Sequence, residues 1–356
     1  MAKPKYKSDR NRRSGKQASV KKGSTDKPAS KDKVARPVEA PPARQVHEGA
    51  RLPEKMGLVL ETLPNRDHAL LDSGDGRKLE RYGDLIIDRP EAQAIWLPSL
   101  DESAWQSADA IFTGDTDEEG VGRWRFPAKT LDETWPMAFD DLRYLGRFTS
   151  FRHTGVFPEQ AAHWRDLERV IEAAQTSIGR PVRMLNLFGY TGIASLVGAR
   201  AGAHVTHVDA SRKAIGWAQD NQTMARLDDR PIRWICDDAV KFCAREVRRE
   251  QSYDIILLDP PSYGRGPKGE VWHLFDHLPH MLDLVRQLQS DTPLMTTLTS
   301  YAIRASSFAL HEIMHEVFAG LEGEIQSGEL VLKQEASERR LSTSMFSRFV
   351  GARAAL

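Results

Sequence analysis

The chain has 356 residues, with 50 Lys and Arg against 50 Asp and Glu, and two cysteines. This length allows one large domain or two modest ones, and so few cysteines exclude a disulfide framework and suit a reducing cytosol. The sequence shows no apolar run near the roughly 20 residues of a membrane helix and no apolar secretory signal, so we expect a cytoplasmic protein without membrane contact.

Residues 1–50 differ in charge from the rest of the chain. They hold 14 Lys and Arg against 5 Asp and Glu, a balance of +9, so the remaining residues sum to −9. This stretch is rich in Lys, Ser, Pro and Ala and cannot bury enough apolar surface to offset its ordering entropy. We therefore predict a disordered basic tail over 1–50, which either contacts nucleic-acid phosphates or only solubilises the chain.

Short apolar segments bounded by turn residues predict strands between residues 55 and 127. These segments are MGLVLETL, HALLD, RKLERYG, LIIDRP and AIWLP. SGDG at 73–76 predicts a hairpin, and AIFTGD and GRWRF predict a second one around the acidic loop at 114–122. We expect a small β-rich module over 51–135, without a catalytic constellation.

From residue 158 the pattern changes to alternating helices and strands. PEQAAHWRDLERVIEAAQTS has helical spacing, with Trp164, Leu167 and Val170 on one stripe. The elements expected after it are strand 182–188, helix 192–201, strand 204–208, helix 211–225, strand 232–236, helix 238–249 and strand 253–258. This alternation predicts an α/β domain over 136–356 with a parallel sheet covered on both faces. We expect SGELVLKQ and SMFSRFV to add an antiparallel edge.

The first of these strands runs into a glycine turn. Gly189 follows the strand and a helix begins after Gly192, which is where a doubly wound sheet binds its ligand. Asp209 ends the next strand, twenty residues later, where a carboxylate can accept both hydroxyls of a ribose. Alternatively, Asp209 only caps the helix that starts at Ser211.

Acidic residues also end the next two strands. IRWIC is followed by Asp238 and Ala239, where a carboxylate could accept a hydrogen bond from an adenine amino group. YDIILL ends in Asp259-Pro260-Pro261-Ser262. Two prolines fix the backbone here, and we expect them to expose carbonyl oxygens that the chain does not use.

NLFGYTG, the Asp209 strand end, DDA and DPPS together resemble the motifs of class I S-adenosylmethionine-dependent methyltransferases with a Rossmann-like sheet. More closely, they are similar to the bacterial large-subunit ribosomal RNA methyltransferase family, whose entry segment HTGVFPEQAAHW at 153–164 matches. The resemblance covers about residues 55–350 and implies S-adenosyl-L-methionine as cofactor and RNA, in particular ribosomal RNA, as substrate.

The resemblance also implies roles for individual residues. Cofactor-binding positions are Gln160, Phe188, Gly189, Tyr190, Thr191, Asp209, Ala210, Asp238 and Ala239. Asp259, Pro260, Pro261 and Ser262 would face the acceptor base, with Asp259 and the Pro260 carbonyl orienting the attacking nitrogen. Catalysis would then depend mainly on alignment, since the sulfonium already activates the methyl group.

The sequence departs from relatives that methylate cytosine C5. Those enzymes attack the ring with a cysteine, but neither DPPS nor TLTSY at 297–301 contains one. Cys236 and Cys243 lie elsewhere, so we predict methylation at a base nitrogen. Amino-methylating enzymes place an aromatic residue directly after the two prolines, whereas here Ser262 precedes Tyr263.

HEIMH at 311–315 matches the H-E-x-x-H pattern of zinc metalloproteases. Helical spacing places His311 and His315 opposite the apolar face, toward solvent. Phe318 and Leu321 stand where a metzincin needs Gly and His. We therefore expect no metal site and no zinc catalysis. A second group, His273, His277 and His280, is expected to be half-buried on a covering helix or to contact the substrate.

Three alternatives to RNA methylation stay open at this stage. They are methylation of a protein or small molecule, a non-catalytic RNA-binding protein with the same fold, and an NAD-dependent dehydrogenase. The last is disfavoured because the turn is not G-x-G-x-x-G. The sequence does not determine the oligomeric state.

Overall fold

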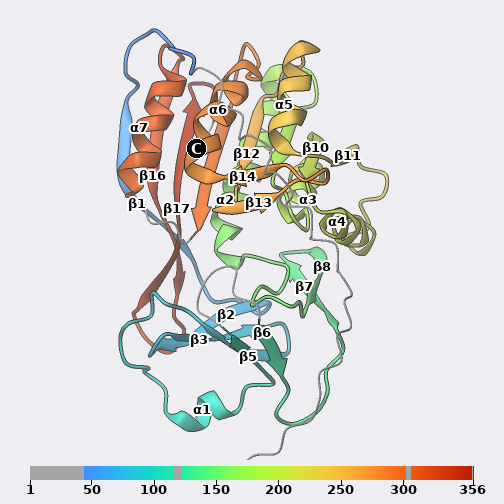
Figure 1. Cartoon of the computed structure of the whole chain (residues 1–356), viewed down its shortest axis with the longest axis vertical. Helices are drawn as coiled ribbons and strands as arrows, with labels where there is room; N and C mark the ends of the chain where they lie inside the picture. The colour runs from blue at the N-terminus through green and yellow to red at the C-terminus, as the bar shows by residue number, and fades with distance from the viewer. Residues whose placement is uncertain (1–43, 115–121, 302–305, 355) are drawn as a thin grey trace, which may run out of the picture. The chain divides into compact units, whose positions relative to one another are not determined.

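The computed structural model describes residues 44–114, 122–301, 306–354 and 356 (Figure 1). Most of the predicted basic tail, and the acidic loop between the two strands of the second hairpin, lie outside these residues. Within the described ranges, no helix is long and apolar enough to span a membrane.

Among the described residues, eight strands form the largest sheet, in the order β1-β16-β17-β15-β12-β9-β10-β11. Their bounds are β1 (Glu54–Thr62), β9 (Arg183–Leu187), β10 (His204–Asp209), β11 (Ile232–Cys236), β12 (Ile255–Leu258), β15 (Met295–Tyr301), β16 (Gly323–Lys333) and β17 (Arg340–Gly351). Strands β9 to β12 and β15 pair in parallel, so their carboxyl ends meet at one edge. The predicted α/β class is confirmed.

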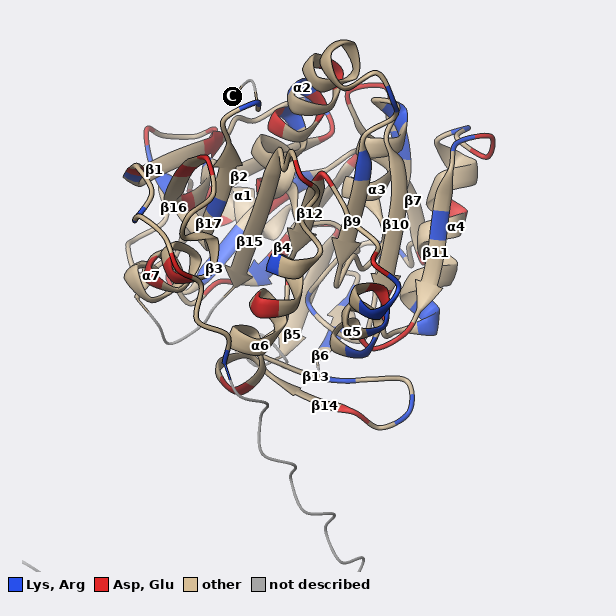
Figure 2. Cartoon of the chain, turned by 90° about the horizontal axis from the view of Figure 1, so that it is seen from above, with Lys and Arg blue, Asp and Glu red and all other residues tan. Residues whose placement is uncertain are grey.

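Helices cover both faces of this sheet, as Figure 2 shows. One face carries α2 (Ala161–Ile178), which follows the short 3-10 turn η1 (Pro158–Gln160), together with α3 (Ile193–Arg200) and α4 (Arg212–Met224). The other carries α5 (Ala239–Arg248), α6 (Leu274–Gln287) and α7 (Ser307–Phe318). The helix and strand bounds between residues 158 and 258 follow the sequence prediction to within about two residues, apart from the short turn at the start.

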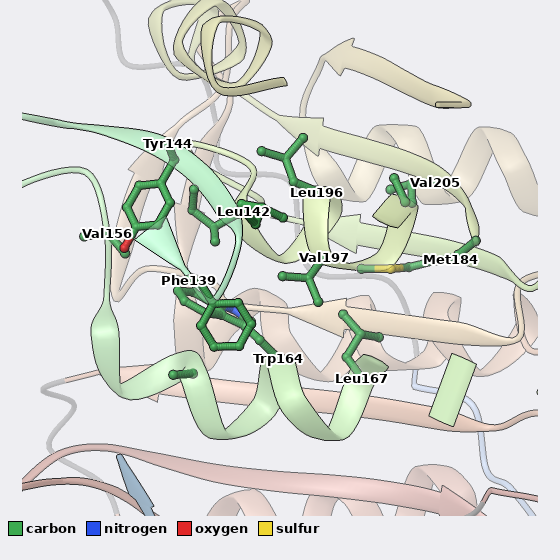
Figure 3. Packing of buried hydrophobic residues seen from close by; sticks show 14 of the residues in the cluster. Phe139, Leu142, Tyr144, Val156, Trp164, Leu167, Met184, Leu196, Val197 and Val205 are labelled. Atoms are coloured by element: carbon green, nitrogen blue, oxygen red, sulfur yellow. The ribbon is translucent and has the colours of Figure 1, made fainter. Parts of the chain in front are cut away.

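Strand alternation divides the core between the two faces. Met184 of β9 packs with α2 and α3, and its neighbours Leu185 and Leu187 pack with the helices opposite. Figure 3 shows the first cluster, where Trp164 of α2 lies near Phe139, with ring centroids 5.1 Å apart. The helices and sheet therefore fix the backbone from which the carboxyl-end turns emerge.

A separate five-stranded sheet lies between β1 and α2 in the sequence. Its described strands are β2 (His68–Gly74), β3 (Arg77–Tyr82), β4 (Leu85–Pro90), β5 (Ala110–Gly114) and β6 (Gly122–Arg125). In the sequence, helix α1 (Glu102–Gln106) lies between β4 and β5. A separate two-stranded sheet follows β6 and consists of β7 (Thr134–Phe139) and β8 (Leu142–Arg147). Both predicted hairpins are confirmed, and the first turns through Asp75 and Gly76 with φ of 51° and 73°.

Three predictions about strands are wrong: one concerns a strand assignment and two concern position in a sheet. AIWLP forms bends, because the Trp96 indole donates to the Ser73 carbonyl and the segment folds over β2. MGLVLETL is β1, which pairs in parallel with β16 in the central sheet and does not join the β-rich module. As a result, β1 is the edge strand, and the hairpin of β16 and β17 lies inside the sheet.

The last residues of the predicted tail, 44–50, make specific contacts. Arg44 Nε donates to Asp283 of α6 at 3.2 Å, and His47 Nε2 lies 3.3 Å from the same carboxylate. Gly49 approaches Gly320 so closely that a Cβ would lie 2.3 Å from the Gly320 Cα. The prediction of disorder is therefore wrong for residues 44–50, because Asp283 offers a buried acceptor for these donors.

The prediction that both histidines of HEIMH face solvent is wrong. His311 is 1% exposed and His315 3% exposed, whereas Glu312 lies at the surface and binds Arg51. The buried face of α7 is rotated toward the histidines because Ser327 of β16 offers His311 Nδ1 a partner at 2.8 Å. Glu54 of β1 also lies beside both histidines, 3.2 Å from His311 Nε2 and 3.0 Å from His315 Nε2.

A pH-dependent ion pair joins the start of β9 to the start of β12. Arg180 donates to both carboxylate oxygens of Asp254, at 2.6 and 2.8 Å, and the Arg183 amide donates at 2.8 Å. Burial acts to raise the pKa of Asp254, but these hydrogen bonds outweigh it and the pKa is lowered. A lowered folded-state pKa stabilises the fold above the unfolded-state pKa, and this stabilisation is lost as the pH falls through the folded value.

We expect Asp254→Asn to lower the free energy of unfolding by about 2 kcal/mol at pH 7, since a buried charge-assisted pair is lost. The difference from wild type should shrink below about pH 4, near the unfolded-state pKa of an aspartate. Urea titrations at several pH values measure this. The exposed Asp229→Asn is the control. An equal loss at pH 7 and pH 3 would show that the charge is not the cause.

Candidate active site

The turn after β9 has an unusual backbone conformation. Phe188 and Tyr190 have φ of 56° and 50°, and Gly192, the N-cap of α3, has φ of 83°. Left-handed backbone at two aromatic residues costs free energy and persists only where the surroundings fix it. Such strain is concentrated at functional sites, and this turn lies at the carboxyl edge of the sheet.

Hydrogen bonds from three neighbouring segments hold the turn. The Tyr190 amide donates to Asp209 Oδ2 at 2.9 Å, and Thr191 Oγ1 donates to the Gly155 carbonyl at 2.6 Å. Asn221 of α4 donates to the Thr191 carbonyl at 2.9 Å. The entry segment, which contains Gly155, is thus docked directly on the predicted cofactor turn.

Asp209 ends β10 beside this turn, and both its oxygens accept backbone N–H groups. Besides the Tyr190 contact, Oδ1 accepts the Ser211 amide at 2.7 Å. The helix cap itself is Ser211, whose hydroxyl accepts the Ala214 amide. Burial raises the pKa of Asp209, and the two amide hydrogen bonds oppose this rise. The carboxylate is therefore oriented by the turn, and the cap of α4 is Ser211 and not Asp209.

Gly189 is required for packing within the protein. A Cβ there would lie 2.4 Å from the His207 ring and 2.9 Å from the Asn186 amide nitrogen. Ser195 Oγ joins these two side chains, at 2.9 Å from His207 Nδ1 and 2.9 Å from Asn186 Nδ2. Burial lowers the pKa of His207 to about 3, so the ring is neutral. This buried trio was not predicted from the sequence. The only indication there was a polar residue among the apolar residues of each of three elements.

We expect Gly189→Ala to lower the free energy of unfolding by about 1 to 3 kcal/mol, because an added methyl group overpacks this trio. Thermal and urea unfolding of the variant measure the loss. Gly216→Ala is the matched control: it lies in α4 with open space around its Cβ position, so alanine should be neutral or stabilising there. Equal stability of the two variants would contradict this role for Gly189.

Asp238 and its neighbours lie at the next strand end. Asp238 Oδ1 accepts the Lys241 amide at 2.9 Å and so caps α5. Ala239 is buried, and the Ala210 carbonyl accepts a hydrogen bond from Cys236 Sγ at 3.6 Å. These residues lie at the carboxyl edge of the sheet. They are not among the residues that line the cleft between the turn and the entry segment.

Gln160 and Asp259 meet across this cleft. Gln160 Nε2 donates to Asp259 Oδ2 at 3.2 Å and to the Tyr301 hydroxyl at 3.0 Å. Phe157 packs on Tyr301, with ring centroids 4.8 Å apart. Tyr301 was not predicted as a site residue from the sequence, where TLTSY was considered only for its lack of a cysteine. Its signal was its place at the end of β15, the strand next to β12.

The expectation that both proline carbonyls stay unused by the chain is wrong for Pro261. The Trp272 indole donates to the Pro261 carbonyl at 2.7 Å, and the Leu274 amide donates to the Ser262 carbonyl at 3.0 Å. Trp272 lies in the short hairpin of β13 (Tyr263–Arg265) and β14 (Val271–His273), which follows DPPS. This hairpin fixes the backbone after Pro260, a contact that the sequence did not indicate.

Of the three histidines after DPPS, His273 ends strand β14 of this hairpin, and His277 and His280 lie in α6. His273 is exposed and precedes α6, where it stacks near His277 with ring centroids 6.3 Å apart. Tyr263 packs against His273 at 5.0 Å. The two cysteines lie elsewhere: Cys243 is buried in α5, where burial raises the pKa of its thiol, and Cys236 ends β11.

The cleft fits S-adenosylmethionine in its chemistry. Gln160, Phe188, Gly189, Tyr190, Thr191 and Asp259 are among the residues that line it. Aromatic rings attract a sulfonium cation, and the oriented Asp209 carboxylate beside the turn can accept ribose hydroxyls. A doubly wound sheet with a strained turn and a strand-end carboxylate defines a nucleoside-binding enzyme of the Rossmann-like class.

Comparison with known proteins specifies this class. The family model described as S-adenosylmethionine-dependent methyltransferase matches residues 120–317. A crystal structure of the SAM-dependent methyltransferase from Agrobacterium tumefaciens shares 54% identity, covers 86% of this chain and 97% of its own, and superposes with a TM-score of 0.83. The chain belongs to the S-adenosylmethionine-dependent methyltransferase family, and S-adenosyl-L-methionine is its cofactor.

More distant relatives carry RNA-related names. Ribosomal RNA large subunit methyltransferase K of Neisseria meningitidis is 26% identical over 69% of this chain and 68% of its own length. The K/L enzyme of Syntrophotalea carbinolica is 32% identical over 36% of this chain, a match that spans only 16% of that longer protein. SMU.776, solved with SAH bound, shares the fold with a TM-score of 0.60 at 17% identity over 80% of this chain and 76% of its own.

Proposed function

We propose that this methyltransferase acts on RNA, in particular large-subunit ribosomal RNA, at a base nitrogen. The observation that carries the proposal is the joining of Gln160, Asp259 and Tyr301 beside the strained turn. An acidic residue followed by two prolines thus faces the same cleft as the cofactor turn. The names of the curated relatives support ribosomal RNA as the substrate class.

Asp259 and Pro260 would hold the acceptor nitrogen. An amino group on a base can donate one hydrogen bond to the Asp259 carboxylate and another to the Pro260 carbonyl, which leaves the nitrogen lone pair free to attack. The cofactor supplies a methyl group that is already activated. Positioning by the protein then accounts for much of the rate, and Trp272 contributes by fixing Pro261.

The remaining assignments complete this proposal. Pro261 and Ser262 would shape the acceptor side, and the cofactor would contact Gln160, Phe188, Gly189, Tyr190, Thr191, Asp209, Ala210, Asp238 and Ala239. A base nitrogen is favoured over cytosine C5 because neither DPPS nor the end of β15 provides a thiol, and the Cys243 thiol is buried.

The test uses S-adenosylmethionine carrying a labelled methyl group. The full-length enzyme is mixed with protein-free large-subunit RNA from cells that lack the gene, and with the same RNA from cells that have it. We expect label only in the first RNA, because the second is already methylated. Label in neither RNA, but in a protein or small-molecule fraction of the deletion cells, would refute RNA as the substrate.

A further inference from the structure

Two imidazoles of HEIMH lie beside the carboxylate of Glu54, at the β1 side of the central sheet. His311 Nε2 lies 3.2 Å from Glu54 Oε2, and His315 Nε2 lies 3.0 Å from the same oxygen. Glu54 starts β1 and pairs with Ile325 near the amino end of β16, whereas Asp259 follows the carboxyl end of β12. Strands β16, β17 and β15 lie between β1 and β12, so three strands of the sheet separate the cluster from the cleft.

The spacing of these three groups matches a metal coordination sphere. All three ligand atoms lie within 4.8 Å of one another. A tetrahedral Zn²⁺ with ligand bonds of about 2.0 to 2.1 Å needs neighbouring ligand atoms about 3.3 Å apart. The two distances to Glu54, 3.2 and 3.0 Å, are close to that value.

His315 supplies an independent sign of a missing ligand. Its side chain is almost completely buried, and Nδ1 has no hydrogen-bond partner among the residues that the structure describes, while Nε2 has only the charge contact with Glu54, without hydrogen-bond geometry. Buried polar atoms without partners are rare and call for an explanation such as an ion. A metal bound to Nε2 would satisfy the nitrogen that lies nearest Glu54.

A second hydrogen-bond layer already orients His311 for such a role. Ser327 Oγ lies 2.8 Å from His311 Nδ1 and 2.8 Å from Ser347 Oγ. A partner at Nδ1 fixes the ring and leaves Nε2 as the ligand atom. Metal-bound histidines usually have such a hydrogen bond at the other ring nitrogen. Glu54 has a half-exposed side chain, so the site is open to solvent for metal entry and for a water ligand.

We propose that Glu54, His311 and His315 form a structural Zn²⁺ site that ties edge strand β1 to helix α7. This reverses the expectation of no metal site, which assumed that both histidines face solvent. The Glu of the motif itself, Glu312, has no part in it, because both its oxygens accept hydrogen bonds from Arg51 at 2.8 Å. Arg51 also donates to Glu54 Oε2 at 3.0 Å, and metal binding would break this contact and leave Arg51 paired with Glu312. The site is independent of methyl transfer, since it lies away from the cleft.

Metal titration of the untagged full chain after chelator treatment tests the site. We expect one equivalent of Zn²⁺ to bind by calorimetry, and Co²⁺ to give the absorption of a tetrahedral site. An excess of Zn²⁺ of about 100 times Kd should raise Tm by about 3 °C or more. No stoichiometric binding to the wild-type chain would refute the proposal.

Glu54→Gln removes one ligand while keeping the shape of an exposed side chain. We expect at least a tenfold loss of Zn²⁺ affinity, with binding of S-adenosylmethionine unchanged as evidence of folding. Glu312→Gln is the matched control: it also deprives Arg51 of a carboxylate but leaves all three ligands, so affinity should stay at the wild-type value. Equal Zn²⁺ affinity of wild type and Glu54→Gln would place the metal elsewhere and overturn the proposal.

Discussion

Asp259→Asn is expected to reduce kcat for methyl transfer to RNA by roughly a hundredfold, with the affinity for S-adenosylmethionine within about threefold of wild type. The carboxylate lies in the cleft, where Gln160 Nε2 contacts it at 3.2 Å, and an amide cannot replace its charge at the acceptor nitrogen. Removal of one preorganised polar group from a transition state has an effect of this size. Single-turnover assays and calorimetry separate the two quantities.

Asp276→Asn provides the control for that experiment. It makes the same chemical change in the first turn of α6, soon after DPPS in the chain, at an exposed side chain. Its kcat should equal that of wild type. A similar loss in both variants, or a loss of cofactor affinity that accounts for the whole effect of Asp259→Asn, would contradict the role given to Asp259.

Asp209→Ala is expected to weaken S-adenosylmethionine binding by about a hundredfold. The alanine removes the acceptor for the Tyr190 and Ser211 amides and the proposed acceptor for the ribose hydroxyls. Hydrogen bonds to a charged group contribute about 1.5 to 3 kcal/mol each, and a hundredfold change in Kd corresponds to about 2.7 kcal/mol. Calorimetric titration with S-adenosylmethionine gives Kd directly.

Two further variants, Asp209→Asn and Asp229→Ala, are the controls for Asp209→Ala. The asparagine keeps an oxygen for one amide and should lose about tenfold, whereas Asp229 is exposed in the loop before β11 and its alanine variant should bind normally. Unfolding curves show whether each variant is folded. Wild-type affinity in a folded Asp209→Ala protein would exclude this carboxylate from cofactor binding.

Local periodicity predicted the central α/β elements well because each strand and helix there carries its own pattern. β9, with Leu185 and Leu187 facing one core and Met184 facing the other, is buried on both sides and is unambiguous as a strand. The position of β1 could not be found in this way. Its pairing with β16 joins residues more than 250 apart, which no local pattern encodes.

The site shows the same division. The positions of NLFGYTG and Asp209 at the carboxyl edge could be predicted because a turn and a strand end have fixed places in a doubly wound sheet. The contacts of Gln160 with Tyr301, and of Trp272 with Pro261, join distant segments through side chains. The burial of His311 depended on Ser327 in another strand, so a helical wheel alone placed it on the wrong side.

The most direct test of RNA methylation is mass spectrometry of the nucleosides in large-subunit ribosomal RNA from cells that lack the gene. The cells would carry either the wild-type gene or Asp259→Asn on a plasmid. We predict that one base-methylated nucleoside is lost in the deletion, restored by the wild type and not restored by the variant. An unchanged set of methylated nucleosides would contradict the proposed substrate, and loss of 5-methylcytosine would contradict the nitrogen target.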